Sequence, residues 1–372
     1  MKIILATGIF TPEIGGPATY VPALAKEFVR LGTDVTVLTY SDSLKVESDG
    51  DLPFPVKRIK RSGTLSNYTR YFFALLKLSR KADVIYCFDH MSAGVPAALV
   101  SYFSDKLLFI RVGGDFIWER YLRMNHEAVS LREYYEKELY KKEKIRFPLI
   151  QWVFGRAKKL FFTTAFQADI FSEYYGFSER KVEIVPNPLP CVEKGLTHQR
   201  KNDDIIFAGR LNRKNNVLRL IQAFADAQSE GLRLRIIGDG EEKESLFRYV
   251  KDNDIPHVVF ENAVSREKLL QIFSECYVAV FPSLTDISPN TMLDCLAVGT
   301  PFLTSKEIGY AWVLEHAKSF DPKDVSDMKR VLEEIMDVSE YEEYRKAMAY
   351  ISYSQTFSAT AEQTLSYIEE SV

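Results

Sequence analysis

Short apolar runs alternate with stretches of helical periodicity at the beginning of the chain. Residues 3–7 form an apolar run, the adjacent glycines Gly15 and Gly16 follow it, and residues 17–31 carry apolar positions at helical spacing. A second apolar run follows at residues 35–39. A strand, a helix and a second strand in this order predict a βαβ unit with parallel strands.

The alternation continues through the first half of the sequence. Further apolar runs of strand length lie at residues 84–88, 107–112, 160–163 and 182–185. Continuous apolar runs are typical of parallel strands that helices cover on both faces. The pattern therefore predicts an α/β fold with a doubly wound, Rossmann-like domain over residues 1–188.

The pattern breaks at Pro188 and restarts after a polar stretch. The new strand-length runs lie at residues 205–208, 232–237, 258–260 and 278–281, with helical stretches near 217–227 and 241–251. They predict a second Rossmann-like domain over residues 189–355, and a last helix, at about residues 356–372, is expected to pack back on the first domain. We expect the two domains to face a central cleft, because ligands of open α/β sheets bind at the carboxyl ends of the strands.

Composition agrees with two soluble globular domains. The 372 residues are 46% hydrophobic and 27% charged, which supplies apolar material for two cores, and the formal net charge of −3 argues against nucleic acid as a partner. The four cysteines lie far apart, so neither a metal site nor a disulfide framework is expected. The opening residues are too soon interrupted for a signal peptide, and we expect a cytoplasmic protein.

One stretch in the second domain carries candidate chemistry at a helix start. Ser288 suits an N-cap and Pro289 suits the first helical position, so a helix is expected to begin here after a buried strand. Free backbone amides at a helix start attract a pyrophosphate. The residues expected to supply this donor-binding helix start are Ser288, Pro289, Asn290 and Thr291.

Two acids accompany this helix. Asp294 lies four residues beyond Asn290, on the same helical face, where its carboxylate can accept hydrogen bonds from a ribose diol. Asp286 lies just before the helix, where a transferred sugar is expected. An N-capped core helix with two incidental acids remains the alternative interpretation.

A basic loop follows the strand at residues 205–208. Arg210 and Lys214 lie in this loop, and two cations at the carboxyl end of a strand can neutralise the charge of a departing diphosphate without a metal. The alternative is an ordinary solvated loop. In the first domain, Gly15 and Gly16 precede a helix and allow the backbone to approach phosphate closely.

Together these features resemble the family 4 retaining glycosyltransferases of the GT-B fold, and the resemblance spans essentially the whole chain. In that family an early Gly-Gly loop approaches the donor phosphates, an arginine and a lysine bind the diphosphate, and two acids in an E-x7-E pattern hold the sugar and the ribose. The positions that match are Gly15 with Gly16, Arg210 with Lys214, and Asp286 with Asp294.

The sequence also departs from the family pattern. Both family glutamates are aspartates here, each shorter by about one methylene, so the sugar is expected to be gripped differently. Asn215 falls where the family lysine is expected, with Lys214 one position earlier. The family histidine near the transferred sugar is absent from the sequence Arg-Val-Gly-Gly that precedes Asp115. On the acceptor side, Asp115 as a partial substitute and His90 after an earlier strand are the candidates.

The resemblance implies an enzyme that transfers a sugar from a nucleoside diphosphate sugar to a hydroxyl with retention of configuration, independent of metal and without a cofactor. Arg210 and Lys214 are expected to stabilise the departing diphosphate, Asp286 to orient the sugar and Asp294 to hold the ribose. Synthesis of cell-surface polysaccharide or glycolipid is the expected context. A catalytically silent sugar-nucleotide-binding homologue and a nucleotide-sugar epimerase of similar fold are the alternatives.

The segment at residues 57–81 is basic throughout and contains no acid. It predicts either an ordinary helix with a basic rim or a face that rests on anionic lipid at the inner side of the membrane. Membrane-surface acceptors are common in the resembled family, which favours a lipid-linked acceptor and a peripheral location. The charged stretch at residues 119–159 interleaves acids and bases, and no chemistry is expected from it.

Overall fold

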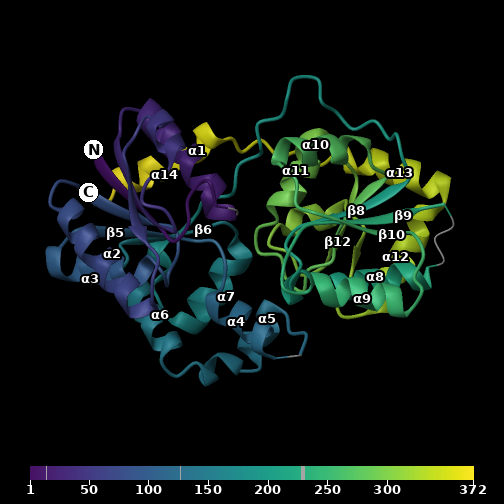
Figure 1. Cartoon of the computed structure of the whole chain (residues 1–372), viewed down its shortest axis with the longest axis horizontal. Helices are drawn as coiled ribbons and strands as arrows, with labels where there is room; N and C mark the ends of the chain where they lie inside the picture. The colour runs from purple at the N-terminus through teal and green to yellow at the C-terminus, as the bar shows by residue number, and fades with distance from the viewer. Residues whose placement is uncertain (14, 126, 228–230) are drawn as a thin grey trace. The chain divides into compact units, whose positions relative to one another are not determined.

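The fold is described from a computed structural model, which covers residues 1–13, 15–125, 127–227 and 231–372 (Figure 1). The chain divides into two compact units. The first comprises residues 1–117, 138–187 and 355–372, and the second comprises residues 118–137 and 188–354.

The first unit is built on a parallel sheet with the strand order β3-β2-β1-β4-β5-β6-β7. Its strands are β1 (Lys2–Thr7), β2 (Asp34–Ser41), β3 (Val56–Lys60), β4 (Val84–Cys87), β5 (Leu107–Val112), β6 (Lys159–Phe162) and β7 (Val182–Ile184). Ile3 of β1 pairs with Val35 on one side and with Val84 on the other, so β1 is central and buried on both faces. The prediction of a doubly wound parallel sheet is confirmed.

Helices cover both faces of this sheet. They are α1 (Gly16–Arg30), α2 (Thr64–Ser79), α3 (Gly94–Ser104), α6 (Arg146–Arg156), α7 (Ala165–Tyr175) and α14 (Phe357–Glu369). In Figure 1, α1 and α14 lie on one side of the sheet, whereas α2, α3 and α6 lie on the other. The last helix, α14, packs on α1 and buries Ala361, Leu365 and Ile368 in the core of the first unit.

The second unit repeats this architecture with the parallel strand order β10-β9-β8-β11-β12-β13. Its strands are β8 (Asp204–Ala208), β9 (Arg233–Ile237), β10 (Val258–Glu261), β11 (Val278–Phe281), β12 (Phe302–Ser305) and β13 (Ser319–Phe320). Its helices include α8 (Val217–Asp226), α9 (Lys243–Asp252), α10 (Arg266–Glu275), α11 (Asn290–Val298), α12 (Val325–Met336) and α13 (Val338–Met348). Figure 1 shows α10 and α11 on one face of the sheet and α8, α9 and α12 on the other.

Residues 118–137 belong to the second unit by their contacts, although the sequence analysis included them in the first domain. They contain most of α4 (Phe116–Met124) and all of α5 (Leu131–Glu136). A capping box at Ser130 begins α5, and the backbone N–H of Leu131 donates to the buried hydroxyl of Thr285 at 2.9 Å. Polar contacts with distant loops, which periodicity does not report, hold this segment.

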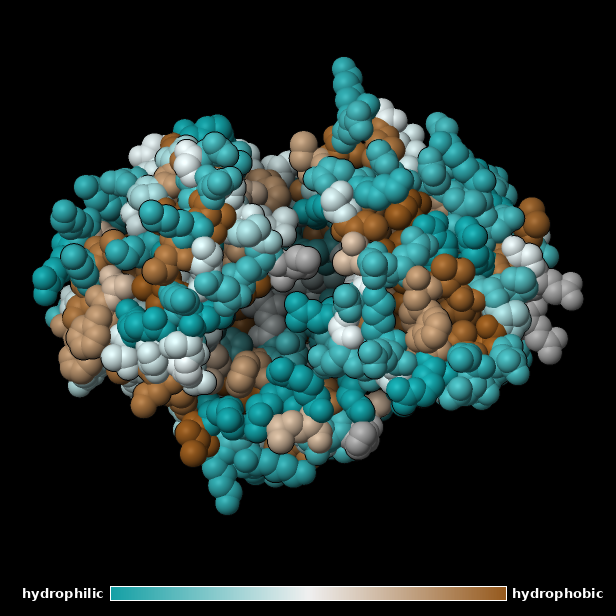
Figure 2. All heavy atoms as spheres, viewed as in Figure 1, coloured by the Kyte–Doolittle hydropathy of each residue, from teal (hydrophilic) through white to brown (hydrophobic). Residues whose placement is uncertain are grey.

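The face drawn in Figure 2 is mainly hydrophilic, with apolar side chains gathered in places. One such gathering, in brown and tan, lies over the region of α2 and α3. Among the helices in the described part of the chain, none is both long and apolar enough to cross a membrane.

Candidate functional site

The basic loop after β8 combines an exposed arginine with a half-buried lysine. The Arg210 side chain is exposed, and within the described residues no ion pair or side-chain hydrogen bond engages its guanidinium. A recess of about 100 Å³ opens beside it, and its charged lining residues are Arg123, Arg210, Arg213, Lys214, Glu119 and Glu241. Four cations against two acids leave the recess positive, which suits an anionic ligand.

Lys214 is held by a carboxylate that the sequence analysis did not assign. Its Nζ lies 3.1 Å from Glu119 Oε1, and Glu119 comes from α4. Burial lowers the pKa of Lys214, but the carboxylates of Glu119 and Asp286 outweigh it, so the net pKa is raised and the ammonium form is favoured. Lys214 is therefore a fixed positive charge near Asp286.

Asp286 is held in place by two backbone hydrogen bonds, one from its N–H and one to its carbonyl oxygen. Its N–H donates to Glu307 O at 2.9 Å, and its carbonyl accepts from the Gly309 N–H at 2.8 Å. Two residues earlier, the N–H of Leu284 donates to Lys214 O at 2.8 Å, which ties the acidic loop to the basic loop. Burial raises the pKa of the Asp286 carboxyl, against the opposing effect of Lys214.

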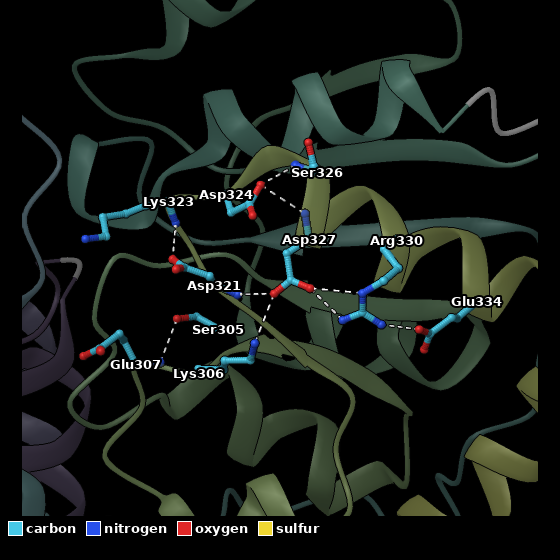
Figure 3. A network of polar contacts seen from close by, with 10 residues as sticks. All are labelled: Ser305, Lys306, Glu307, Asp321, Lys323, Asp324, Ser326, Asp327, Arg330 and Glu334. Atoms are coloured by element: carbon cyan, nitrogen blue, oxygen red, sulfur yellow. Dashed lines mark hydrogen bonds and ion pairs between the residues drawn. The ribbon is translucent and has the colours of Figure 1, made fainter.

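A polar network behind this loop supports the backbone that holds Asp286 (Figure 3). The Asp327 carboxylate accepts from the Asp321 N–H at 2.8 Å and lies 3.1 Å from Lys306 Nζ and 2.6 Å from Arg330. Ser305 Oγ accepts from the Glu307 N–H at 3.0 Å. Burial by itself would raise the pKa of Asp327, but the Asp321 N–H, Arg330 and Lys306 lower it to about 2.

The helix start after Asp286 differs by one residue from the prediction. We expected Ser288 as the N-cap and Pro289 as the first helical residue, whereas α11 begins at Asn290 with Pro289 at the N-cap. The N-cap assignment of Ser288 is therefore wrong. Proline fits both positions because its fixed φ, here −70°, suits extended and helical backbone alike. Asn290 is exposed and Thr291 is half-buried at this helix start.

Asp294, expected to bind ribose, is engaged within the protein. It is 5% exposed, and its Oδ1 accepts from Arg266 Nε at 3.0 Å and lies 2.5 Å from Arg266 Nη2. Burial raises the pKa of Asp294, and Arg266 opposes this effect. Only Oδ1 is bound to Arg266 in these contacts, so a ribose ligand would have to share this carboxylate with the guanidinium.

Two glycines after β9 allow the backbone of residues 238–240 to lie close to the basic loop after β8. Gly238 and Gly240 both have φ near 156°, and a Cβ at either position would collide with a backbone oxygen, that of Gly209 or of Leu211. The Leu211 N–H donates to Asp239 O at 2.9 Å in this contact. The Gly-Asp-Gly sequence thus positions the loop that carries Arg210.

The first unit contributes a glycine helix start of its own. Gly15 is the N-cap of α1 with φ near 155°, and a Cβ there would lie 2.6 Å from the Ile9 side chain. Gly16 has open space around its Cα, and Pro17 follows in the first turn. Because Gly15 has no side chain, it cannot cap the first amides of α1.

A larger recess, of about 410 Å³, lies wholly in the first unit. Its polar lining residues, from the ends of several strands and the first turn of α2, are Tyr40, Arg61, Thr64, Asn67, Tyr68, Asp89 and Ser92. His90 and Asp115, the predicted acceptor-side residues, are 5% and 0% exposed and do not line it. Asp89, the residue before His90, lines the recess instead. The sequence pattern did not indicate which of the two adjacent residues faces the recess.

Sequence analysis missed Glu119, which lines the recess, and Thr285, a buried residue that anchors the segment at residues 118–137. Glu119 contacts Lys214, 95 positions away, and the Thr285 hydroxyl accepts from Leu131 N–H, 154 positions away. No spacing rule reaches across such separations. Among the described residues, no group of three or more histidine, cysteine or acidic side chains is arranged to hold a metal ion.

Two parallel, doubly wound units with cationic and acidic loops at their strand ends define the GT-B class of glycosyltransferases. Solved structures share this fold: HepE of Anabaena in complex with UDP has a TM-score of 0.75 at 14% identity, with both chains covered in full. Sucrose-phosphate synthase of Thermosynechococcus elongatus also has a TM-score of 0.75 at 14% identity, covering 99% of this chain and 98% of that one.

Sequence comparison gives the family. The model "Glycosyltransferase Family 4" matches residues 14–192, and "Glycosyl transferases group 1" matches residues 193–355. A protein described as an uncharacterized glycosyltransferase of Methanocaldococcus jannaschii is 23% identical over 350 residues, covering 85% of this chain and 83% of the relative. The chain belongs to the family 4, group 1 glycosyltransferases, as its sequence motifs predict.

Proposed function

We propose that the protein transfers a sugar from a nucleoside diphosphate sugar to a hydroxyl acceptor with retention of configuration. The observation that carries this proposal is the exposed Arg210, which has no ion pair within the described residues, beside the ammonium of Lys214 in a positive recess. A diphosphate leaving group needs such positive charge, because negative charge builds on it as the glycosidic bond breaks. Side-chain cations supply it in this proposal, so chelators are expected to leave activity unchanged.

The proposed step balances without a protein nucleophile. The acceptor oxygen forms a bond to the anomeric carbon on the face from which the diphosphate departs, and the carbon–oxygen bond to the diphosphate breaks. The acceptor proton passes to the departing phosphate oxygen. Arg210 and Lys214 stabilise the diphosphate, and the amides at the start of α11 and at Gly15–Gly16 are proposed as further phosphate donors. Asp286 orients the sugar.

We propose a uridine diphosphate sugar as the donor, since HepE, which shares the fold, binds UDP and UDP-glucose. Thermal denaturation with UDP, GDP and UDP-glucose tests this choice, because a ligand of the native state raises the melting temperature. A shift with UDP and none with GDP is expected. A shift with GDP alone would reject the uridine nucleotide and keep the reaction class.

The recess of the first unit is proposed to bind the acceptor. Its arginine, Arg61, is neutralised by Glu13 at 2.6 Å and Asp42 at 3.4 Å, and Asp89 adds a negative charge. Two tyrosines, Tyr40 and Tyr68, offer aromatic faces and hydroxyls. Such a lining suits an uncharged polyol or sugar ring better than a phosphate, so we propose a glycan acceptor, carried on lipid, for surface polysaccharide or glycolipid synthesis.

The Asp294–Arg266 pair favours one competing interpretation, a silent sugar-nucleotide-binding protein, because Oδ1 of the acid proposed to bind ribose is already bound to Arg266. Donor hydrolysis measured beside calorimetric binding separates the two. Binding of UDP-glucose without hydrolysis or transfer to any acceptor would support the silent protein. A nucleotide-sugar epimerase would instead form an isomeric sugar nucleotide or free sugar in the absence of acceptor.

A further inference from the structure

An exposed aromatic cluster joins α2 and α3 in the first unit. Phe73 is 61% exposed, Tyr102 57% and Phe103 67%. The rings follow one another: Phe72 contacts Phe73 at 5.3 Å and Phe103 at 6.2 Å between ring centroids, and Phe103 contacts Tyr102 at 5.2 Å. In the described part of the chain, only Phe247 and Tyr350 are aromatic side chains of comparable exposure elsewhere. This clustering indicates an interaction surface.

The structure also sorts the basic segment at residues 57–81 into two groups. Arg58 and Arg61 face inward and are paired with acids, Arg58 with Asp49 at 2.7 Å. Their charges are therefore unavailable to a partner, which corrects the prediction that the whole segment forms one basic face. The residues that remain exposed and form no ion pair with the described residues are Lys57, Lys60, Lys77, Arg80 and Lys81.

Two cations, Lys77 and Arg156, border the aromatic cluster. Leu65, Phe73 and Lys77 lie on one outward stripe of α2 at intervals of four or eight residues, so the cation follows the ring by one turn. On the α3 side, the Arg156 guanidinium lies 5.3 Å from the centre of the Tyr102 ring. Figure 2 shows apolar side chains over α2 and α3 with hydrophilic ones around them.

We propose that this face, made of the outward stripe of α2 and the end of α3, docks on an anionic lipid bilayer with Phe73 and Phe103 inserted among the headgroups. The inference deepens the proposed lipid-carried acceptor by giving the surface that would meet the lipid, and it does not depend on catalysis. Apolar rings with a cationic border match the two parts of such a bilayer, its acyl region and its anionic headgroups.

Asp83 and Asp105 are acids near the face. Asp83 accepts from the backbone N–H of Lys2 at 2.7 Å, and Asp105 is the exposed C-cap residue of α3. The exposed cations of the segment at residues 57–81 outnumber these two acids. Helix α2 contains no acid, and α3 contains no charged residue of either sign. Tyrosine side chains such as Tyr102 are common at membrane interfaces, because the ring is apolar and the hydroxyl can hydrogen-bond to water.

Co-sedimentation with vesicles tests the proposal on the full chain. Phosphatidylcholine vesicles that contain phosphatidylglycerol are expected to bind the protein, and vesicles of phosphatidylcholine alone to bind it much less. The double variant Phe73→Ser, Phe103→Ser is expected to bind the anionic vesicles at least roughly tenfold more weakly than the wild type. Phe247→Ser removes a phenyl ring of 58% exposure from α9 and is expected to leave binding unchanged.

Charge variants test the second part of the match. Lys77→Gln and Lys81→Gln are each expected to weaken binding to the anionic vesicles roughly fivefold, and added salt to weaken it further. Lys251→Gln, on α9, is the control and should have no effect. If the α9 variants lost vesicle binding to the same extent, the protein would adsorb non-specifically, and the proposal would be overturned.

Two further outcomes would overturn it. One is absence of wild-type binding to anionic vesicles; the other is a concentration-dependent dimer in sedimentation velocity that the Phe73, Phe103 double variant abolishes, which would assign the face to a second copy of the chain. UDP binding measured on the same variants should stay at the wild-type value. Failure of UDP binding in every variant and in the wild type would instead reject the proposed donor, not the docking face.

Discussion

The strand-end recesses of the two units have the same place in the fold and opposite chemistry. In the second unit, Arg210 is exposed without a partner among the described residues, and four cations face two acids. In the first unit, Arg61 is neutralised by Glu13 and Asp42, and two tyrosines, Tyr40 and Tyr68, contribute to the lining. Both sheets are parallel and doubly wound.

The difference teaches that topology locates a site and the pairing of its charges selects the ligand. A parallel doubly wound sheet brings loops together at its carboxyl edge whatever their sequence. An unpaired cation in that place attracts an anion, whereas a paired cation is left to donate hydrogen bonds to neutral groups. On this basis we assign the diphosphate to the second unit and a polyol to the first.

The largest effect is expected from Arg210→Ala. Losing one cation that stabilises the departing diphosphate should lower kcat by about 10²–10³-fold, equivalent to about 3–4 kcal/mol. Steady-state transfer from UDP-glucose measures it, and an unchanged melting temperature shows that the variant is folded. Arg248→Ala removes another exposed arginine of the same unit, from α9, and should keep wild-type turnover.

Gly238→Ala is expected to break the scaffold of the anionic site. The new Cβ would collide with Gly209 O at a backbone conformation that side chains rarely adopt, so unfolding free energy should fall by about 2–4 kcal/mol. Urea denaturation measures the change. Gly155→Ala is the control, because space around Gly155 in α6 is open and alanine favours a helix; a loss as large there would refute the local explanation.

The sequence predicts those features of the two recesses that depend on residues close together in the chain. Most strands were predictable because buried parallel strands, such as residues 107–112, are continuous apolar runs. Strand β3 was missed because three of its five residues are basic, and the short β12 and β13 were missed as well. The Arg210 loop was predictable as the loop at a strand end. The neutralisation of Arg61 was not, since Glu13 lies 48 positions away and no local pattern reports the pair. The same holds for Glu119 and Lys214.

Helix starts show a second limit. The predicted start of α11 lies one residue too early, because Pro289 suits both the N-cap and the first helical position and only the backbone geometry distinguishes them. Burial set a third limit. His90 and Asp115 follow strands, as site residues do, but their side chains are buried instead of lining the recess.

Asp327→Asn tests the network behind Asp286 and should cost about 1–2 kcal/mol of stability at neutral pH. The folded-state pKa of about 2 lies below the usual value near 4, so the wild-type advantage is present above about pH 4 and is lost as the pH falls towards 2. Urea denaturation of both proteins from pH 7 to 2.5 checks it. A constant difference over this range would contradict the assigned cause.

The smallest effect is expected from Glu119→Gln, which sharpens the comparison by removing an acid from the cationic recess. Glu119 competes with an anionic ligand for Lys214, so the amide should raise the affinity for UDP about two- to fivefold. Calorimetric titration measures the affinity. Glu241→Gln removes an acid from the same recess, but not the one that is paired with Lys214, and should give a smaller gain. Weaker binding by Glu119→Gln would instead mean that the pair positions Lys214.

The crystal structure of the protein soaked with UDP tests the central claim most directly. The assignment predicts diphosphate density in the second unit, within hydrogen-bonding distance of the Arg210 guanidinium and of the first amides of α11. Density for UDP at another place, with Arg210 and the α11 start still without ligand, would contradict it.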